Sequence, residues 1–244
     1  MHTVIFGGTK GMGKVVAREL KKRGDDLSIF SRFIPSDEHK IVGCKYYAAD
    51  ISNGDDVLSS LNSAIVLSGN INYMIFCQRY RGNSDSWAGE LEVSLSGPKR
   101  IVEAMHSNFS VSGDRGIVFV SSMLGDKIGE GHDLSYHIGK AGINHMSRYF
   151  AVILGRKGIR VNSVTPSTFL KEESKDFYLN NKDLMDLYKS IVPLGRMGTA
   201  EDSANLIQFL CSPAAQFING QNICVDGGLS LIWPEKMARQ LKSV

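Results

Sequence analysis

Cysteine is scarce in this sequence, and the positions of the four cysteines exclude two kinds of site. They stand at Cys44, Cys77, Cys211 and Cys224, far apart, with no C-x-x-C pair and no histidine cluster beside them. This arrangement indicates neither a zinc site nor a disulfide framework. We therefore expect reduced thiols, as in a cytosol, and no metal site.

Long apolar runs and tracts of one charge are also lacking. The N-terminal stretch "MHTVIFGG" lacks the basic region of a signal peptide, its apolar run ends at Gly7, and no stretch of the sequence reaches the length of a membrane span. The 28 basic and 25 acidic residues are mixed along the chain and leave a net charge of +3, without the basic tract that nucleic-acid binding needs. We expect a cytoplasmic protein that binds neither membranes nor nucleic acids.

What the chain does have is a regular alternation of short apolar runs and longer amphipathic segments. The runs predict buried strands at 2–8, 26–32, 72–78, 116–122, 159–166 and 222–228. The amphipathic segments predict helices at 10–24, 53–65, 94–107, 136–155 and 200–212. The alternation predicts an α/β fold, a Rossmann-type doubly wound parallel sheet in three α/β/α layers, and the length of 244 residues suits one domain over 1–244. Ligands of such sheets bind beyond the carboxyl ends of the strands.

A glycine-rich turn, "GGTKGMG", follows the first predicted strand and leads directly into the first predicted helix. Glycine lets the chain turn tightly and lets a pyrophosphate approach backbone N–H groups at the helix N-terminus, where the dipole favours negative charge. The spacing Gly7-x-x-x-Gly11-x-Gly13 differs from the commonest dinucleotide fingerprint. Its place between a first strand and a first helix still predicts a nucleotide site.

The second predicted strand ends with Ser31 and Arg32, where a protein that binds NAD usually has an acidic residue for the ribose hydroxyls. No carboxylate is there to repel a 2′-phosphate. Arg32 and Lys10 are suited to bind that phosphate, since a guanidinium makes bidentate contacts. NADP(H) is therefore the preferred cofactor, with NAD(H) possible, and the alternative is two solvated surface cations.

Tyr136 and Lys140 stand four positions apart in "SYHIGKAG", a spacing that places them on one face of a helix. With these pieces in order, the sequence resembles the classical short-chain dehydrogenase/reductase (SDR) family over nearly the whole chain. "FGGTKGMG" is similar to the family's glycine loop, and "VSSMLG" carries Ser122 at the place of its catalytic serine. Tyr136 and Lys140 fall on its Y-x-x-x-K motif, and "GIRVNSVTP" resembles a later strand.

The resemblance implies an oxidoreductase that transfers a hydride between NADP(H) and a ketone or secondary alcohol. It implies that Tyr136 is the acid and base, that Lys140 holds the nicotinamide ribose and favours the ionised tyrosine, and that Ser122 hydrogen-bonds the substrate oxygen. It places Asp50 and Ile51 at the adenine ring. The cofactor contacts it implies are Gly7, Thr9, Lys10, Gly11, Met12, Gly13, Ser31, Arg32, Asp50, Ile51, Cys77, Gln78, Tyr136, Lys140, Pro166 and Phe169. A small-molecule carbonyl or alcohol substrate and a homodimer or homotetramer are the expected partners.

Several positions depart from the family's pattern. Phe76 to Arg79 replace its N-N-A-G with bulk and charge. Few residues remain between the strand predicted at 26–32 and the place of the family's third strand, which leaves little room for the helix usually found there. Ser94 occupies the place of the asparagine that supports a water-linked proton relay; its hydroxyl still donates and accepts, so Ser94 is a fourth catalytic candidate. Lys171 replaces a threonine that often contacts the cofactor, in a segment, about 168–195, that stands where the family has a substrate lid.

Two other functions remain open. The block "PLGRMGTAEDSANLIQFLCSPAAQFINGQNICVDGG" also resembles 3-oxoacyl-acyl-carrier-protein reductases. A non-catalytic nucleotide sensor is the second alternative, and the intact Ser122, Tyr136 and Lys140 speak against it. The altered N-N-A-G and Ser94 favour a specialised substrate, such as a sugar-derived or secondary-metabolite ketone, and Arg79 and Arg81 near the expected pocket mouth favour an anionic one.

Overall fold

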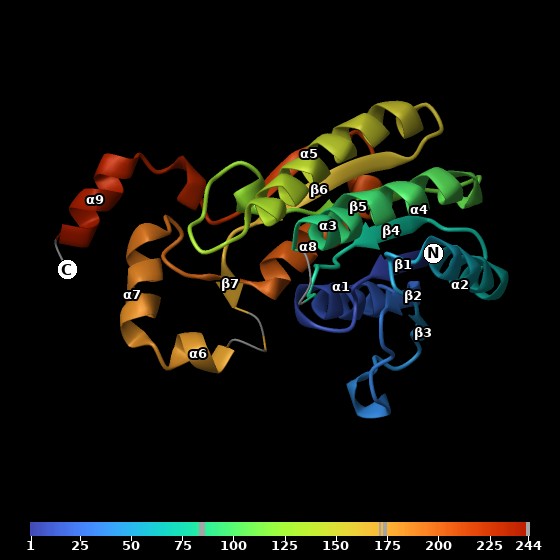
Figure 1. Cartoon of the computed structure of the whole chain (residues 1–244), viewed down its shortest axis with the longest axis horizontal. Coiled ribbons are helices and arrows are strands. Elements are labelled where there is room, and N and C mark those ends of the chain that lie inside the picture. The colour runs from blue at the N-terminus through green and yellow to red at the C-terminus, as the bar shows by residue number, and fades with distance from the viewer. Residues whose placement is uncertain (83–85, 171, 173–174, 243–244) are drawn as a thin grey trace.

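A parallel sheet forms the centre of the computed structural model, which describes residues 1–82, 86–170, 172 and 175–242 (Figure 1). Within these residues the sheet has seven strands in the order β3-β2-β1-β4-β5-β6-β9. Their bounds are β1 His2–Phe6, β2 Asp26–Ser31, β3 Lys45–Ala48, β4 Tyr73–Phe76, β5 Gly116–Val120, β6 Arg160–Pro166 and β9 Asn222–Val225. The order reverses between β1 and β4, and ligands bind outside the carboxyl ends of the strands at such a point.

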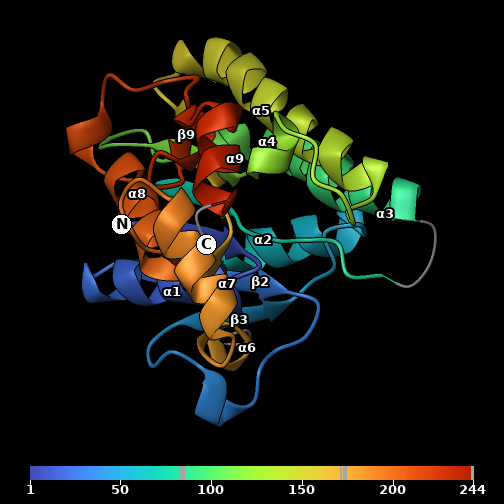
Figure 2. The same ribbon diagram turned by 90° about the vertical axis from the view of Figure 1, so that its left-hand side faces the viewer.

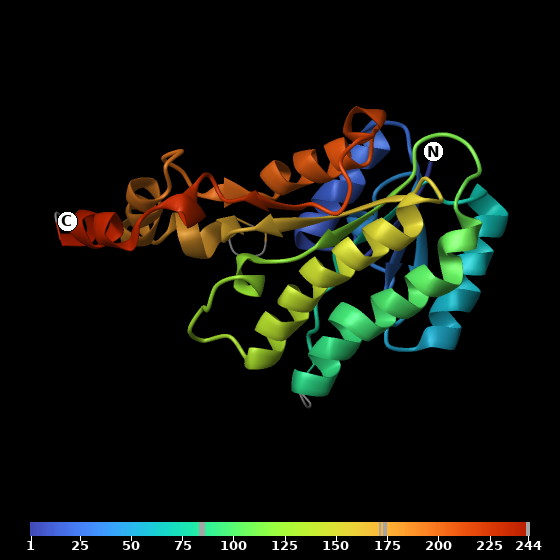
Figure 3. The ribbon, with the colours of Figure 1, turned by 90° about the horizontal axis from the view of Figure 1, so that it is seen from above.

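Helices cover both faces of this sheet, as the sequence predicts (Figure 3). On one face lie α1 (Gly11–Lys22) and α8 (Ala200–Leu210). On the other lie α2 (Gly54–Ser68), α4 (Gly97–Met105) and α5 (Leu134–Gly155). Because side chains of a strand alternate between faces, Val4 joins the core under α2, α4 and α5, whereas Ile5 joins the core under α1 and α8. The doubly wound three-layer fold is therefore confirmed.

One strand of the sheet is absent from the six predicted apolar runs. This strand, β3, lies at the edge of the sheet, and its sequence KYYA is only partly buried. An edge strand of this kind carries little hydrophobic signal. The connection from β2 to β3 contains only a 3₁₀ turn, Asp37–His39, which agrees with the predicted lack of room for a helix.

The helix predicted at 94–107 begins earlier than its sequence pattern indicates. It runs continuously through α3 (Ser86–Leu91), a π-helical turn at Glu92–Ser96 and α4. Gly97, which follows the π turn, lies close to the backbone of Ile51. A Cβ at Gly97 would lie 2.7 Å from the carbonyl oxygen of Ile51. Serine and glycine are poor helix formers, and Ser86 and Gly89 in α3 explain why the pattern before residue 94 does not predict a helix.

The described residues of the segment at 168–195 lie outside the seven-stranded sheet. Its first residues form β7 (Phe169–Leu170), which pairs with β8 (Gly198–Thr199). The helices α6 (Lys175–Leu179) and α7 (Lys182–Ile191) follow, and α7 lies beside the C-terminal helix α9 (Pro234–Lys242) at one end of the molecule (Figures 1 and 2). Neither α6 nor α7 buries a side chain against the described residues. Lys171 lies outside the described residues, as do positions 173 and 174.

Candidate active site

Tyr136 and Lys140 lie one turn apart near the start of α5, at the end of strand β5. Lys140 is only 3% exposed, and its Nζ lies 5.5 Å from the centre of the Tyr136 ring. The ammonium donates a hydrogen bond to the carbonyl of Val120, at 3.2 Å, and the hydroxyl of Ser121 donates to the carbonyl of Lys140, at 3.0 Å. These two bonds join α5 to the end of β5 and hold the lysine below the tyrosine ring.

The charge of Lys140 is sensitive to its surroundings. Burial lowers its pKa to about 8 from the usual 10.5; the carboxylate of Glu90 opposes this shift, and the guanidinium of Arg79 adds to it. Burial also raises the pKa of the Cys77 thiol to about 12, so the thiol remains neutral beside the lysine. Lys140 therefore titrates close to the physiological range, where small changes in nearby charge alter its protonation.

The turn that carries Ser122 packs against α5 at Lys140. Ser122 precedes a 3₁₀ turn at Met123–Gly125, and its Oγ accepts a hydrogen bond from the N–H of Leu124 at 3.2 Å. A Cβ at Gly125 would lie 2.9 Å from the carbonyl carbon of Lys140, so glycine permits this approach. With the Leu124 amide donating to its oxygen, the Ser122 hydroxyl retains its own proton to donate to a ligand.

Two exposed basic side chains lie beside the Tyr136 ring. The guanidinium carbon of Arg79 is 5.1 Å from the ring centre, and the His132 ring is 5.5 Å from it. A guanidinium at this distance from a tyrosine ring makes a cation–π contact. The sequence predicts Arg79 near the mouth of the pocket, and the structure places its guanidinium against the ring of the candidate catalytic tyrosine.

The glycine loop is shaped by close backbone contacts. Gly7 has a φ of 79°, and a Cβ on it would lie 2.7 Å from the backbone N and Cα of Gln78. A Cβ on Gly13 would collide with the carbonyl of Gly7. No side chain of the described chain caps the N-terminus of α1 at Lys10, and its first turn carries no acidic residue. The start of α1 therefore suits an anion such as a pyrophosphate.

Gln78 offers a second feature that fits a dinucleotide. Its Nε2 donates to the carbonyl of Val93, at 3.1 Å, in the π turn. Its Oε1 is buried and has no hydrogen-bond partner among the described residues. Buried polar atoms without a partner are rare in folded proteins, and a ribose hydroxyl would satisfy this acceptor beside the glycine loop.

At the other end of the expected cofactor site, Lys10 and Arg32 are both exposed and form no ion pair within the described chain. The Ser31 hydroxyl donates to the carbonyl of Phe33, at 2.7 Å. The Asp50 carboxylate accepts from the N–H and hydroxyl of Ser52, at 3.0 and 2.7 Å, and Ile51 is 7% exposed in the core. Asp50 and Ile51 thus have structural roles in addition to the adenine contact implied by the resemblance.

The remaining predicted cofactor residues fall into three places. Thr9, Gly11 and Met12 belong to the glycine loop and the start of α1, where Met12 is 8% exposed. Pro166 is buried at the end of β6. Phe169 lines a hollow of about 180 Å³ together with Ser167, Tyr188 and Asp226. This hollow joins the ends of β6 and β9 to the segment at 168–195, on the side expected for a ligand.

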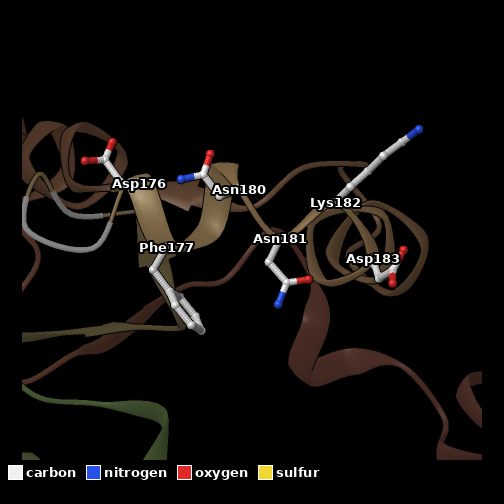
Figure 4. A pocket seen from close by; sticks show the side chains of 6 residues that line it. All are labelled: Asp176, Phe177, Asn180, Asn181, Lys182 and Asp183. Carbon is white, nitrogen blue, oxygen red and sulfur yellow. The ribbon is translucent and has the colours of Figure 1, made fainter.

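A larger hollow of about 560 Å³ lies between α6 and α7 and contains none of the predicted site residues (Figure 4). Its lining consists of Asp176, Phe177, Asn180, Asn181, Lys182 and Asp183. All six side chains are exposed, so it is a surface depression. We therefore place the candidate active site at Tyr136 and Lys140, where buried charge and hydrogen bonds converge.

Sequence reasoning missed one buried acid of this site, Glu90. It is 4% exposed and accepts a hydrogen bond of 2.5 Å from the hydroxyl of Ser94, which is 1% exposed. The available signal was the spacing of four between the two residues, which places them on one face of a helix. That signal was hidden because no helix was predicted before residue 94.

In the part of the chain that the structure describes, no three His, Cys, Asp or Glu side chains group as a metal site would require. None of the described helices combines the length and apolar character of a membrane-spanning segment.

The parallel sheet, the glycine loop at its switch point and the lysine beneath a tyrosine define a nucleotide-binding fold of the Rossmann type. Residues 7–230 match a family model described as enoyl-(acyl carrier protein) reductase. The chain therefore belongs to the short-chain dehydrogenase/reductase family, whose members are oxidoreductases that act on CH–OH or C=O groups.

Curated relatives match nearly the whole chain. A tropinone reductase homologue of Arabidopsis thaliana is 28% identical over 246 residues, covering 95% of this chain and 91% of the relative. An isoepoxydon dehydrogenase of Penicillium expansum is 26% identical over 246 residues, covering 93% of this chain and 94% of the relative. These relatives support the family assignment along the full fold.

Solved structures show the same fold. A short chain dehydrogenase of Leptospira borgpetersenii with bound NAD⁺ gives a TM-score of 0.79 at 24% identity, covering 94% of this chain and 92% of that chain. A short-chain dehydrogenase/reductase of Brucella melitensis, described as glucose/ribitol dehydrogenase, also gives 0.79 at 24% identity, covering 93% and 96%.

Proposed function

We propose that this protein transfers a hydride between NADP(H) and a ketone or secondary alcohol, with Tyr136 as the acid and base. The observation that carries the proposal is the buried ammonium of Lys140, held by the Val120 carbonyl 5.5 Å from the centre of the Tyr136 ring. When bound, the nicotinamide supplies or accepts the hydride. Everything else in the reaction is a task for this chain's own residues.

Tyr136 gives its phenolic proton to the substrate oxygen during reduction and takes it back during oxidation. The nearby ammonium of Lys140 favours the ionised phenol by charge attraction. Ser122 donates a hydrogen bond to the substrate oxygen as negative charge develops there. Ser94 orients a water on the path that returns a proton to Lys140, since its oxygen can accept a hydrogen bond from that water while its own proton is donated to Glu90.

The preference for NADP(H) is supported by the exposed outer end of the site. Lys10 and Arg32 have no ion-pair partner within the described chain, and β2 ends in Ser31 and Arg32 without a carboxylate there to repel a phosphate. A 2′-phosphate between an ammonium and a guanidinium gains charge-assisted hydrogen bonds. The relative with bound NAD⁺ is at 24% identity and shares the fold only, so the choice between the cofactors rests on these residues.

The substrate class is supported by two observations. The relatives are named as a tropinone reductase homologue and an isoepoxydon dehydrogenase, which agrees with a ketone or secondary alcohol as the substrate. Arg79, exposed at the Tyr136 ring, adds a positive charge at the site that favours an anionic ketone. The segment at 168–195 is proposed as the lid over this substrate, because Phe169 and Tyr188 line the hollow beside it.

We also infer a homodimer or homotetramer that uses α5. Tyr149, Val152 and Ile153 on this helix are 58%, 70% and 49% exposed, which leaves an apolar surface free. Light scattering of the wild type and of Val152→Glu tests this inference: the substitution is expected to lower the mass to that of a smaller assembly.

The test of the proposed function is a screen of ketones and alcohols with both nicotinamide cofactors, run beside Tyr136→Phe. We expect NADPH-dependent reduction of at least one carbonyl compound, lost in the variant. Calorimetric binding of NADPH with no turnover across the whole panel would instead support a nucleotide sensor.

A further inference from the structure

A buried hydroxyl–carboxylate pair packs against the catalytic helix. The pair is Ser94 and Glu90, joined by a hydrogen bond of 2.5 Å and almost wholly removed from solvent. Burying a carboxylate is costly unless hydrogen bonds or an opposite charge compensate it. The hydrogen bond from Ser94 supplies one part of that compensation, and the neighbouring elements must supply the other.

The pair contacts α5 at the residue immediately before Lys140. A Cβ on Gly139 would lie 3.3 Å from the Cβ of Ser94 and 3.4 Å from both the Cγ and the Oε1 of Glu90. Gly139 therefore lets the pair rest directly on the helix backbone. The π turn at Glu92–Ser96 widens the helix at this point, a distortion that often marks functional sites.

Lys140 follows Gly139 on α5, and the carboxylate of Glu90 attracts its ammonium. The groups that act on the charge of Lys140 are Glu90 from α3, and Arg79 and Cys77 from the loop after β4. Tyr136 faces it from the same helix, and the Val120 carbonyl faces it from β5. Glu90 is the acidic member of this described set, and Arg79 opposes it as a second cation.

We propose that Glu90 is a positioning residue for the reaction: its carboxylate orients the Ser94 hydroxyl and keeps Lys140 in the ammonium form. This inference rests on the proposed function for its role in turnover, but its effect on Lys140 does not depend on turnover. Glu90 touches neither substrate nor cofactor in this scheme, and acts through its two neighbours.

The hydroxyl of Ser94 has one partner for its proton and one for its oxygen. Serine has one proton to donate, and Glu90 takes that hydrogen bond, which leaves the Ser94 oxygen free to accept from a water on the way to Lys140. The negative charge of Glu90 also offsets the repulsion between Lys140 and Arg79. The buried carboxylate of Glu90 therefore compensates the positive charge that Arg79 brings to the site beside Tyr136.

Glu90→Gln tests the charge with little change of shape, and Glu92→Gln is the matched control. Glu92 lies two residues further along the same helix and forms its ion pair with Arg100, at 2.7 Å. The titration of Lys140 is followed by NMR in cofactor-free protein with ¹³C-labelled lysine, and its signal is assigned by its loss in Lys140→Met. We expect Glu90→Gln to lower the titration midpoint of Lys140 by about one pH unit, and Glu92→Gln to leave it unchanged.

An unchanged midpoint in Glu90→Gln would overturn the proposal. Glu90→Leu fills the same space without charge and provides the same test if Glu90→Gln does not fold. In turnover, the limb of the pH–rate profile that reports loss of the lysine proton is expected to move to lower pH by the same amount. If the wild type reduces no ketone, the proposed function fails, whereas the NMR titration still decides the role of Glu90.

Discussion

The polar side chains at the two ends of the candidate site differ in their exposure to solvent. At the inner end, Lys140, Glu90 and Ser94 are 3%, 4% and 1% exposed, and each has a fixed partner. At the outer end, Lys10 and Arg32 are exposed and lack an ion-pair partner within the described chain. Buried charges need partners because desolvation is costly, whereas exposed charges are free to bind a ligand and are screened by salt.

This difference separates chemistry from selectivity. A change at the inner end is expected to alter proton transfer and the stability of the fold together, because the same hydrogen bonds serve both. A change at the outer end is expected to alter which cofactor binds and to leave the core intact. The predictions below test this separation, from the largest expected effect to the smallest.

Tyr136→Phe is expected to lower kcat by about 10²- to 10⁴-fold, the range typical of a lost general acid. Cofactor affinity should stay nearly the same, because the ring remains and only the hydroxyl is removed. Steady-state kinetics and calorimetry measure the two quantities. Tyr149→Phe, an exposed tyrosine further along α5, is the control and should keep full activity. Retained activity in Tyr136→Phe would remove this residue from the mechanism.

Lys140→Met is expected to make the cofactor-free protein more stable at neutral pH by about 3 kcal/mol, although it removes activity. The pKa of Lys140 is about 8 in the folded protein and 10.5 ordinarily, and each unit is worth about 1.4 kcal/mol. Below pH 8 Lys140 is protonated in both the folded and the unfolded protein, so the free-energy cost of burying its charge does not change with pH. Between pH 8 and 10.5 the unfolded chain holds more protons, so the wild type gains stability as pH rises.

Urea unfolding across this pH range measures the difference between the wild type and Lys140→Met. The difference should shrink as pH rises from 8 to 10.5, since the buried lysine loses its charge there. Lys182→Met, an exposed lysine on α7, should show no such trend. A variant less stable than the wild type at every pH would show that the Val120 contact outweighs the burial of the charge.

We expect the wild type to bind NADPH at least about tenfold more tightly than NADH, since about 1.4 kcal/mol of binding free energy gives that factor. Arg32→Ala is expected to remove most of this preference. Ser31→Asp should reverse the preference by placing a carboxylate against the 2′-phosphate. Titration of both reduced cofactors by calorimetry measures this, and added salt should weaken NADPH more than NADH. Arg18→Ala, an exposed cation on α1, should leave the ratio unchanged. Equal affinities in the wild type would mean that Lys10 and Arg32 are solvated surface cations.

Ser94→Ala is expected to slow turnover less than the loss of Tyr136, because water can partly replace the hydroxyl. It also leaves the Glu90 carboxylate without its hydrogen bond, so the pH–rate profile should change shape. Ser96→Ala, an exposed serine in the same π turn, is the control. An alanine variant that matches the wild type at every pH would make Ser94 a packing residue.

The sequence predicts the central fold well because six of the strands are buried runs and the helices between them are amphipathic. It predicts β3 poorly, since an edge strand of two tyrosines, a lysine and an alanine has no clear pattern. The fixed-spacing motifs predict Ser122, Tyr136 and Lys140 as catalytic candidates, because residues at the end of one strand and on one helix face are set by local sequence spacing. Glu90 and Arg79 depend on which segments the fold brings together, and local patterns do not contain that information.

The most direct test of the account follows the hydride itself. NADPH that carries deuterium at both C4 positions of the nicotinamide is mixed with a ketone identified in the screen, and the product alcohol is analysed by mass spectrometry. The account predicts that the wild type delivers one deuterium to the carbonyl carbon from one face of the cofactor, and that Tyr136→Phe binds NADPH but forms almost no labelled alcohol. Unlabelled alcohol from the wild type, or equal labelling by Tyr136→Phe, would contradict it.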